Sequence, residues 1–111
     1  MNENLEQLLK QTTHRTFQHS WCKQDEKRIV EDLYGLSHTG GFFILGMTSD
    51  YEVRGLKNET ALELQSKLQC HSRKGKRLHG LIDCFSVYEM EDFQNFPTII
   101  IVITIKKRSL I

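Results

Sequence analysis

Apolar residues recur at helical spacing in three stretches of the chain, which predicts three amphipathic helices. In the first stretch, three leucines share one face. In the other two, Asp25 and either Asn58 or Thr60 are placed to act as N-caps. Each predicted helix has a polar opposite face, so each is expected to bury one side only. The predicted helices cover residues 3–10, 25–36 and 58–70.

Shorter apolar stretches indicate strands. The last of them, 98–105, is an unbroken β-branched run, which is typical of a central strand buried on both faces. A polar turn at 48–50 separates two apolar segments, which predicts a β-hairpin. The strands are expected within 11–22, 42–45, 51–54, 81–88 and 98–105. We therefore expect an α+β fold with about five mostly antiparallel strands in one sheet and helices packed mainly on one face.

Glycines frame the segment from Ser37 to Leu56. Gly40 and Gly41 let the backbone turn before the first apolar strand of the hairpin, and Gly46 and Gly55 close its two halves. The order of helix, polar loop, Gly-Gly, apolar strand, polar turn and x-Val-x-Gly resembles the core of the Schlafen or AlbA-2 type domain. This resemblance implies one Schlafen-like lobe spanning residues 1–111.

Composition limits the possible functions. At 111 residues the chain has the size of one domain with its own core. Its 15 basic and 14 acidic residues give a net charge of +1, so any nucleic-acid contact must come from local clustering of cations. Three cysteines without framework spacing favour a reducing compartment, and we expect a cytoplasmic protein. We expect no secretory signal and no membrane segment, because the apolar runs are too short.

The resemblance also identifies candidate catalytic positions. Schlafen nucleases cleave RNA with two glutamates and an aspartate that hold a divalent metal, which polarises the phosphate and activates a water molecule. In this chain Gln11 and Thr16 fall at the glutamate positions and Thr48 falls in the aspartate turn, while Asp50 lies one or two residues late and is a possible substitute. Hydroxyl and amide groups are poor ligands for a hard cation. We therefore expect no metal site or cofactor in this chain, with Mg²⁺ or Mn²⁺ acting only in a catalytic complex.

A basic stretch follows the third predicted helix and supplies the candidate RNA-binding residues. One interpretation is a solvated loop whose charges keep the protein soluble. The other is contact with phosphates, where each neutralised charge releases counterions, and the RNA-binding role of the resembled family favours it. Lys106, Lys107 and Arg108 are expected to end the last strand in solvent. The candidate RNA-binding residues are Arg73, Lys74, Lys76 and Arg77.

Two other groups of residues invite a functional interpretation. Four cysteine and histidine residues suggest zinc, but their spacing lacks both C-x2-C and H-x3-H, so we expect no zinc site. They are Cys70, His71, His79 and Cys84. Cys84 lies in an apolar strand and is expected in the core. Phe17 and Trp21 are able to stack on bases, but aromatic residues next to a helix are more often core residues.

The sequence thus favours a non-catalytic Schlafen-like subunit of an RNA-processing endoribonuclease complex, similar to the one that trims piRNA precursors in small-RNA silencing. Expected partners are RNA and either a catalytic Schlafen-like homologue or a second copy of the chain. The leucine face of the first helix (Leu5, Leu8 and Leu9) packs either against the domain or against a partner, and association would cover this face and any free sheet edge. The alternatives are an active metal-dependent endoribonuclease that uses Asp50 and Glu52, and a DNA-binding regulatory AlbA-2 domain.

Overall fold

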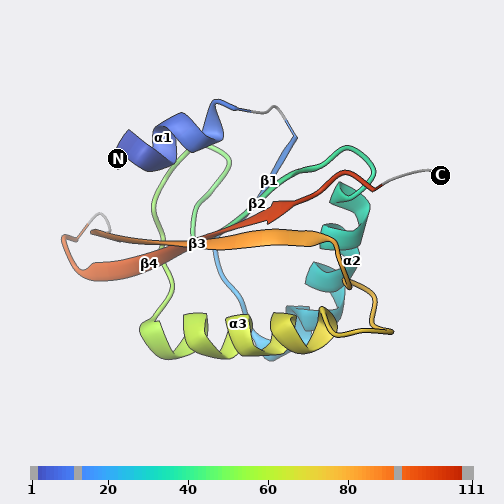
Figure 1. The fold of residues 1–111 in the computed structure, drawn as a ribbon. Helices are drawn as coiled ribbons and strands as arrows, with labels where there is room; N and C mark the ends of the chain where they lie inside the picture. The colour runs from blue at the N-terminus through green and yellow to red at the C-terminus, as the bar shows by residue number, and fades with distance from the viewer. Residues whose placement is uncertain (1–2, 12–13, 92–93, 109–111) are drawn as a thin grey trace.

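The computed structural model describes residues 3–11, 14–91 and 94–108, which form one four-stranded mixed sheet with helices on both faces (Figure 1). The strand order is β1-β2-β4-β3; β1 and β2 are parallel and the other two pairs are antiparallel. The elements are α1 (Glu3–Leu9), β1 (Arg15–Gln18), the 3₁₀ helix η1 (Lys23–Asp25), α2 (Glu26–Leu36), β2 (Gly41–Leu45), α3 (Asn58–His71), β3 (Ile82–Glu91) and β4 (Pro97–Ile105).

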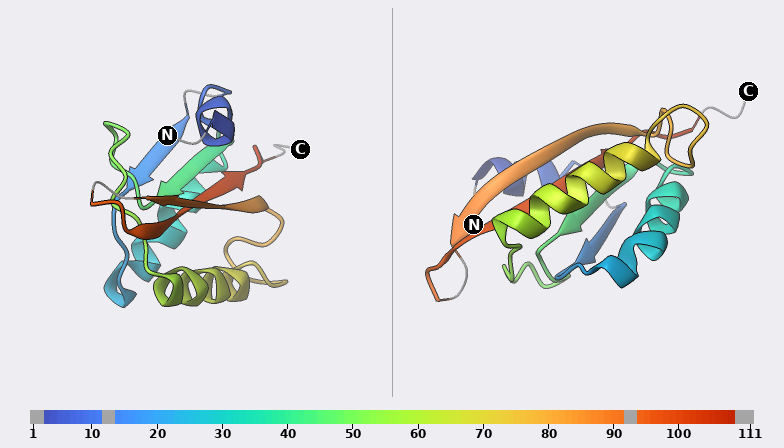
Figure 2. Two further views of the ribbon diagram at one scale, coloured as in Figure 1. Left: turned by 90° about the vertical axis from the view of Figure 1, so that its left-hand side faces the viewer. Right: turned by 90° about the horizontal axis from the view of Figure 1, so that it is seen from below.

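The α+β class is confirmed, whereas the strand count and pairing differ from the expectation. The described chain has four strands, and β1 pairs with β2 in parallel because the chain returns through α2. Figures 1 and 2 show α2 and α3 on one face of the sheet and α1 on the other. No helix among the described residues is long and apolar enough to cross a membrane.

β4 is the central strand, as its unbroken β-branched sequence predicts. Its alternating side chains enter two cores, because successive residues of a strand point to opposite faces. Ile101 and Ile103 join the first core, under α2 and α3, together with Leu33 and Leu64. Ile100 and Val102 join the second core, under α1. All the β4 residues from Ile100 to Ile103 are fully buried.

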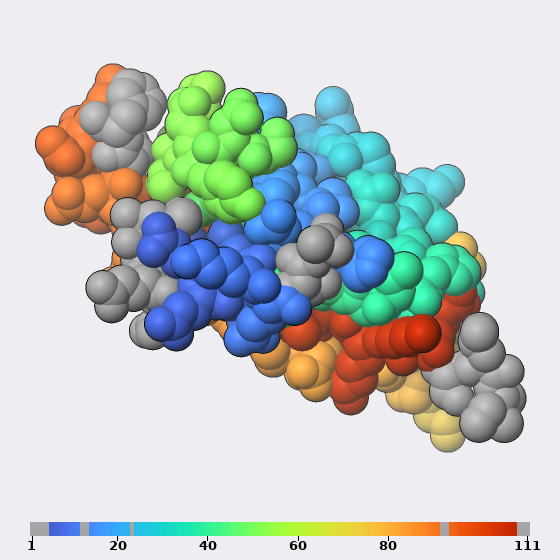
Figure 3. All heavy atoms as spheres, turned by 90° about the horizontal axis from the view of Figure 1, so that it is seen from above, coloured from blue at the N-terminus to red at the C-terminus, as the bar shows by residue number. Residues whose placement is uncertain are grey.

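α1 corrects the expectation of an exposed leucine face. Leu5 and Leu9 are 0% and 2% exposed and pack on Phe42 and Ile44 of β2, while Leu8 is partly buried. Seen from the α1 side, α1 and the loop that follows β2 lie next to each other on the sheet (Figure 3). The apolar face of α1 therefore packs on the sheet of its own domain, and no partner chain is needed to bury it.

The predicted hairpin is wrong in its second half. Tyr51–Arg54 forms no strand; its only pairing is an isolated bridge between Met47 and Val53. The physical reason is that the loop closes on itself: the N–H groups of Arg54 and Gly55 both donate to the carbonyl of Gly46, at 2.9 and 2.7 Å. The segment is therefore a compact loop, and the sheet keeps four strands.

Two of the framing glycines are required by close backbone contacts. Gly41 has φ 152°, and a Cβ there would lie 2.2 Å from the carbonyl oxygen of His14, where β1 begins. Gly55 has φ 76°, and a Cβ there would lie 1.6 Å from Oγ1 of Thr98, at the start of β4. Glycine at these positions thus lets β2 and the following loop approach their neighbours.

Helix caps and strand limits also differ from the predictions. Asp25 occupies the N-cap position of α2 but makes no side-chain cap, and the N-cap of α3 is Lys57, so neither Asn58 nor Thr60 serves as the cap. β3 continues through the acidic residues up to Glu91, three residues beyond its predicted end at Tyr88.

Candidate nucleic-acid interface

The positions that correspond to the Schlafen carboxylates do not converge. Thr16 lies with Glu31 and Asp32 of α2 around a shallow depression on the α2 face. Its neighbour Phe17 contacts Tyr51, which belongs to the loop on the α1 face. Because side chains alternate along β1, Thr16 and this loop lie on opposite faces of the sheet. Thr48 and Asp50 belong to the same loop as Tyr51, and Gln11 lies exposed after α1.

The carboxylates nearest Thr16 pair with arginines. Glu31 accepts a hydrogen bond from Arg77 at 2.9 Å, and Asp32 pairs with Arg28 at 3.4 Å. Glu52, in the loop after β2, pairs with Arg54 at 3.0 Å, and Asp50 is exposed. Within residues 3–11, 14–91 and 94–108 there is no group of three His, Cys, Asp or Glu residues placed to hold a metal ion.

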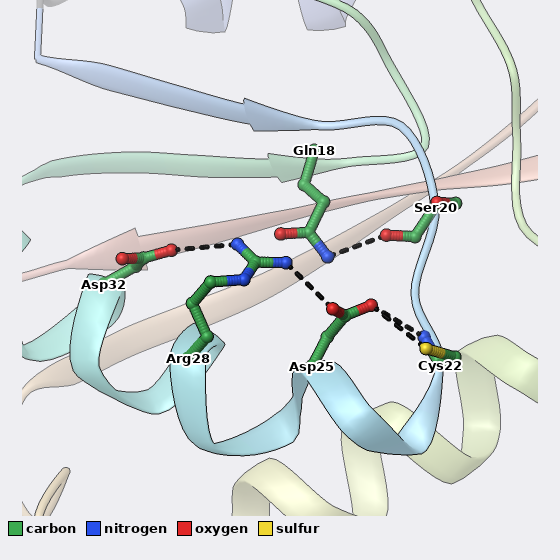
Figure 4. Close-up of polar contacts among 6 residues, drawn as sticks. All are labelled: Gln18, Ser20, Cys22, Asp25, Arg28 and Asp32. Atoms are coloured by element: carbon green, nitrogen blue, oxygen red, sulfur yellow. Dashed lines mark hydrogen bonds and ion pairs between the residues drawn. The ribbon is translucent and has the colours of Figure 1, made fainter.

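A polar network joins the end of β1 to the start of α2 (Figure 4). Arg28 pairs with Asp25 at 3.1 Å, and this hydrogen bond is the main reason why the pKa of Asp25 lies below its usual value. Asp25 also accepts hydrogen bonds from the N–H and the thiol of Cys22, while Gln18 donates to the carbonyl of Ser20 at 2.7 Å. These groups hold the β1–α2 connection in place.

The basic loop begins where α3 ends. Ser72 donates from its hydroxyl to the carbonyl of Leu68 at 2.9 Å, which satisfies one carbonyl of the last turn. Leu78 is fully buried, and its N–H donates to the carbonyl of His71 at 3.0 Å, so the loop is anchored at both ends. Gly75, with φ 84°, turns the chain at the tip. The exposed cations of the loop are Arg73, Lys74, Lys76 and Arg77.

Arg77 is also exposed, but it differs from the other three predicted RNA-binding residues because its side chain contacts α2. Its guanidinium lies 3.8 Å above the ring centroid of Tyr34 in α2 and pairs with Glu31. Arg108 also reaches Tyr34: it lies 4.5 Å from the ring centroid, donates to the phenol oxygen at 2.5 Å and contacts the ring of His38. The prediction that Arg108 ends β4 in solvent is therefore wrong, because its side chain contacts Tyr34 and His38.

These contacts bring two basic segments to one end of the domain. The N–H of Lys106 donates to the carbonyl of Leu81 at 2.9 Å, so residues 106–108 lie beside the end of the basic loop. Figures 1 and 2 show the loop, the end of β4 and the end of α2 at the same end of the molecule. We call this surface the basic end. Its cations are Arg73, Lys74, Lys76, Arg77, Lys106, Lys107 and Arg108.

The cations of the basic end lie near the C-termini of two helices. α2 and α3 both finish here, and the carbonyls of a helix C-terminus carry partial negative charge that favours nearby cations. Lys106 approaches Asp83 at 3.9 Å, a weak exposed pair. Among the described residues, Arg73, Lys74, Lys76 and Lys107 have no carboxylate partner. The loop after α3 and residues 106–108 come together only in the folded chain, so sequence spacing alone did not indicate this surface.

The structure does not bring the predicted zinc candidates together. Cys70, His79 and Cys84 are exposed, so the expected core position of Cys84 is wrong, because β3 is an edge strand. His71 contacts Glu26 at 3.2 Å, and Lys67 contacts the other oxygen of that carboxylate at 3.3 Å. The hydrogen bond with His71 is the main reason why the pKa of Glu26 is lowered.

The two aromatic candidates lie in the interior or at its margin. Trp21 is 8% exposed and belongs to the first core, which confirms that it is a core residue. Phe17 packs at the margin of the second core and meets Tyr51 edge to face, with ring centroids 5.6 Å apart.

Comparison of the chain with protein-family models and with curated proteins gives no match. The function is therefore inferred from the geometry of the residues described above.

Proposed function

We propose that this chain is a non-catalytic, Schlafen-like RNA-binding subunit that acts with a catalytic homologue in an endoribonuclease complex for small-RNA precursors of the piRNA type. The basic end is the observation that carries this proposal. Its exposed cations come from the loop after α3 and from the end of β4, and four of them lack a carboxylate partner among the described residues. A phosphate backbone that crosses this end meets charges from both segments, which gives affinity without sequence readout.

The placement of the candidate catalytic positions supports the proposal that this chain is non-catalytic. Thr16 lies on the face opposite the loop that holds Thr48 and Asp50, so these positions do not surround a common metal. The nearby acids Glu31 and Asp32 each pair with an arginine. A hard divalent cation needs several converging oxygen ligands, which a partner chain would have to supply.

A free sheet edge supports the assembly part of the proposal. Among the described strands β3 pairs only with β4, so its outer edge, ten residues long, has no strand partner in this part of the chain. Val87, at the middle of β3, is 49% exposed. A stable complex would bury at least about 1,200 Å² in total, and Val87→Lys should weaken it because an edge lysine disfavours strand addition. A monomer in light scattering, together with no complex on co-expression with a catalytic homologue, would contradict this part.

RNA binding is tested by removing the three loop cations that have no carboxylate partner among the described residues. We expect the Arg73→Ala/Lys74→Ala/Lys76→Ala variant to bind single-stranded RNA more weakly. The slope of log affinity against log salt should become shallower by up to about 2, since each lost contact contributes about 0.7. The matched control is Lys27→Ala/Arg54→Ala/Lys57→Ala, which removes three exposed cations outside the basic end. An equal change of slope in both variants would refute a specific role for the basic end.

The same assay separates the alternatives. We expect no cleavage of the RNA with Mg²⁺ or Mn²⁺, and cleavage that Asp50→Asn abolishes would establish an active endoribonuclease instead. A DNA strand of equal length serves as the second ligand. Tighter binding of DNA than of RNA would favour the regulatory DNA-binding alternative.

A further inference from the structure

A second site lies on the α1 face, outside the basic end. It is an open pocket of about 280 Å³ between the end of α1, the start of β1 and the loop after β2, on the face seen in Figure 3. The pocket combines an aromatic ring, two cations and one carboxylate. Its lining residues are Glu6, Leu9, Lys10, Arg15 and Tyr51.

Arg15 is held in place at the floor of this pocket. Its Nη1 donates to the carbonyl of Leu9, the last residue of α1, at 3.2 Å and to the phenol oxygen of Tyr51 at 2.6 Å. Both of its described hydrogen bonds thus come from Nη1, which leaves the N–H of Nε and the two N–H groups of Nη2 as three further donors. No described carboxylate pairs with Arg15. The pocket therefore presents a fixed positive group that keeps donors for a ligand.

Tyr51 is presented by an unusual backbone. Its φ of 66° lies in the left-handed region, which residues with a side chain seldom adopt. Hydrogen bonds close the turn around it, from the N–H of Tyr51 to the carbonyl of Thr48 at 2.9 Å and from the N–H of Glu52 to the hydroxyl of Thr48 at 3.1 Å. Phe17 packs against the ring, which remains 40% exposed. The loop therefore fixes an aromatic surface beside Arg15.

We propose that this pocket binds a nucleoside monophosphate unit, with the base on the ring of Tyr51 and the phosphate at Arg15 and Lys10. Every base has a π-face that stacks on an aromatic side chain. A guanidinium binds phosphate through paired, charge-assisted hydrogen bonds. The carboxylate of Glu6 only accepts hydrogen bonds, so it favours a base that carries an exocyclic amino group.

The same chemistry has two sources, a free nucleotide or one nucleotide of a bound RNA. Only the second source rests on the proposed function. The two are separated by titrating ¹⁵N-labelled protein with 5′-AMP and, in a parallel series, with a 5′-phosphorylated adenine trinucleotide. Adenosine and inorganic phosphate are the matched partial ligands.

We expect 5′-AMP to give saturable shifts of the amides of Lys10, Arg15 and Tyr51. Adenosine and phosphate should each bind at least about tenfold more weakly, because each lacks one of the two contacts. Inorganic phosphate that binds as tightly as 5′-AMP would overturn the proposal, and so would shifts confined to the basic end. Shifts of the pocket amides by the trinucleotide at lower concentration than by 5′-AMP would identify RNA as the source.

Tyr51→Gly is the decisive variant. Glycine suits the φ of 66°, so the change removes the ring without disturbing the backbone. We expect affinity for 5′-AMP to fall about 5- to 150-fold, which corresponds to the loss of one stacked base. Leu62→Ala, which changes an exposed side chain of α3 outside the pocket, should bind 5′-AMP as the unchanged protein does. Unaltered affinity in Tyr51→Gly would refute the pocket, whereas 5′-AMP binding without any RNA binding would leave the pocket standing and refute the proposed function.

Discussion

Gly55→Ala tests the tight approach of the loop after β2 to the start of β4. The added methyl would meet Thr98 at 1.6 Å from Oγ1, 2.3 Å from Cγ2 and 2.4 Å from Cβ. No rotamer of Thr98 clears this overlap, because its Cβ does not move when the side chain rotates. Either the loop or β4 must shift, and β4 contributes to both cores.

The stability lost in Gly55→Ala has two parts, and a matched variant separates them. Alanine in the left-handed region costs about 1–2 kcal/mol, and overpacking costs a further 1–3 kcal/mol or so. Gly75→Ala should show only the first part, because Gly75 has φ 84° and a Cβ there meets no atom within 4 Å. We therefore expect a loss of about 1–2 kcal/mol in the free energy of unfolding for Gly75→Ala and about 2–5 kcal/mol for Gly55→Ala.

Urea unfolding followed by circular dichroism measures both values. Thr98→Gly removes all three of the clashing atoms, so Gly55→Ala should cost about 1–3 kcal/mol less in that background, as a double-mutant cycle would detect. Equal costs for Gly55→Ala and Gly75→Ala, with no dependence on Thr98, would refute the steric argument.

Two other predictions concern stability. Leu5→Ala should lower the free energy of unfolding by about 2–5 kcal/mol, because Leu5 is fully buried, whereas Leu62→Ala, at a residue 58% exposed, should change it by less than about 0.5 kcal/mol in the same urea titration; similar losses would mean that α1 does not pack as described. The pKa of Glu26 is lowered from 4.5 in the folded state, so its stabilising contribution is constant above that pH and is lost as the pH falls through the folded pKa. The difference in unfolding free energy between the unchanged protein and Glu26→Gln should therefore shrink from pH 7 to pH 3, and a constant difference would contradict the role of the His71 and Lys67 contacts.

Elements with a strong local pattern were predicted well from the sequence. α2 has apolar residues at helical spacing. β4 is an unbroken β-branched run, so the position of β4 in the interior of the sheet followed from this run alone. The parallel pairing of β1 with β2 was missed, because the connection between strands decides it and strand pattern does not. The sequence left open whether the domain or a partner covers Leu5 and Leu9, because leucine spacing marks an apolar face but does not say what covers it.

The candidate site was predicted only in part. The basic loop is evident in the sequence, and all four of its predicted RNA-binding cations are exposed in the structure. The packing of Arg77 and Arg108 on Tyr34 joins three segments that lie far apart in the sequence, and no spacing rule connects them. The pocket beside Tyr51 depends on a left-handed residue at a position where the sequence predicted an ordinary strand.

β4 lies in the interior of the sheet, yet it follows the other three described strands in the sequence, and this order affects folding during translation. The parallel pair β1–β2 needs β4 beside it, since Ile101 and Ile103 complete the first core and Ile100 and Val102 complete the second. A ribosome that has not yet released residues 97–105 therefore holds a chain with α1, α2 and α3 but with neither core closed. β3 and β4 are close in sequence and can pair quickly once both are made. The domain should then form in a single step, once β4 has been synthesised.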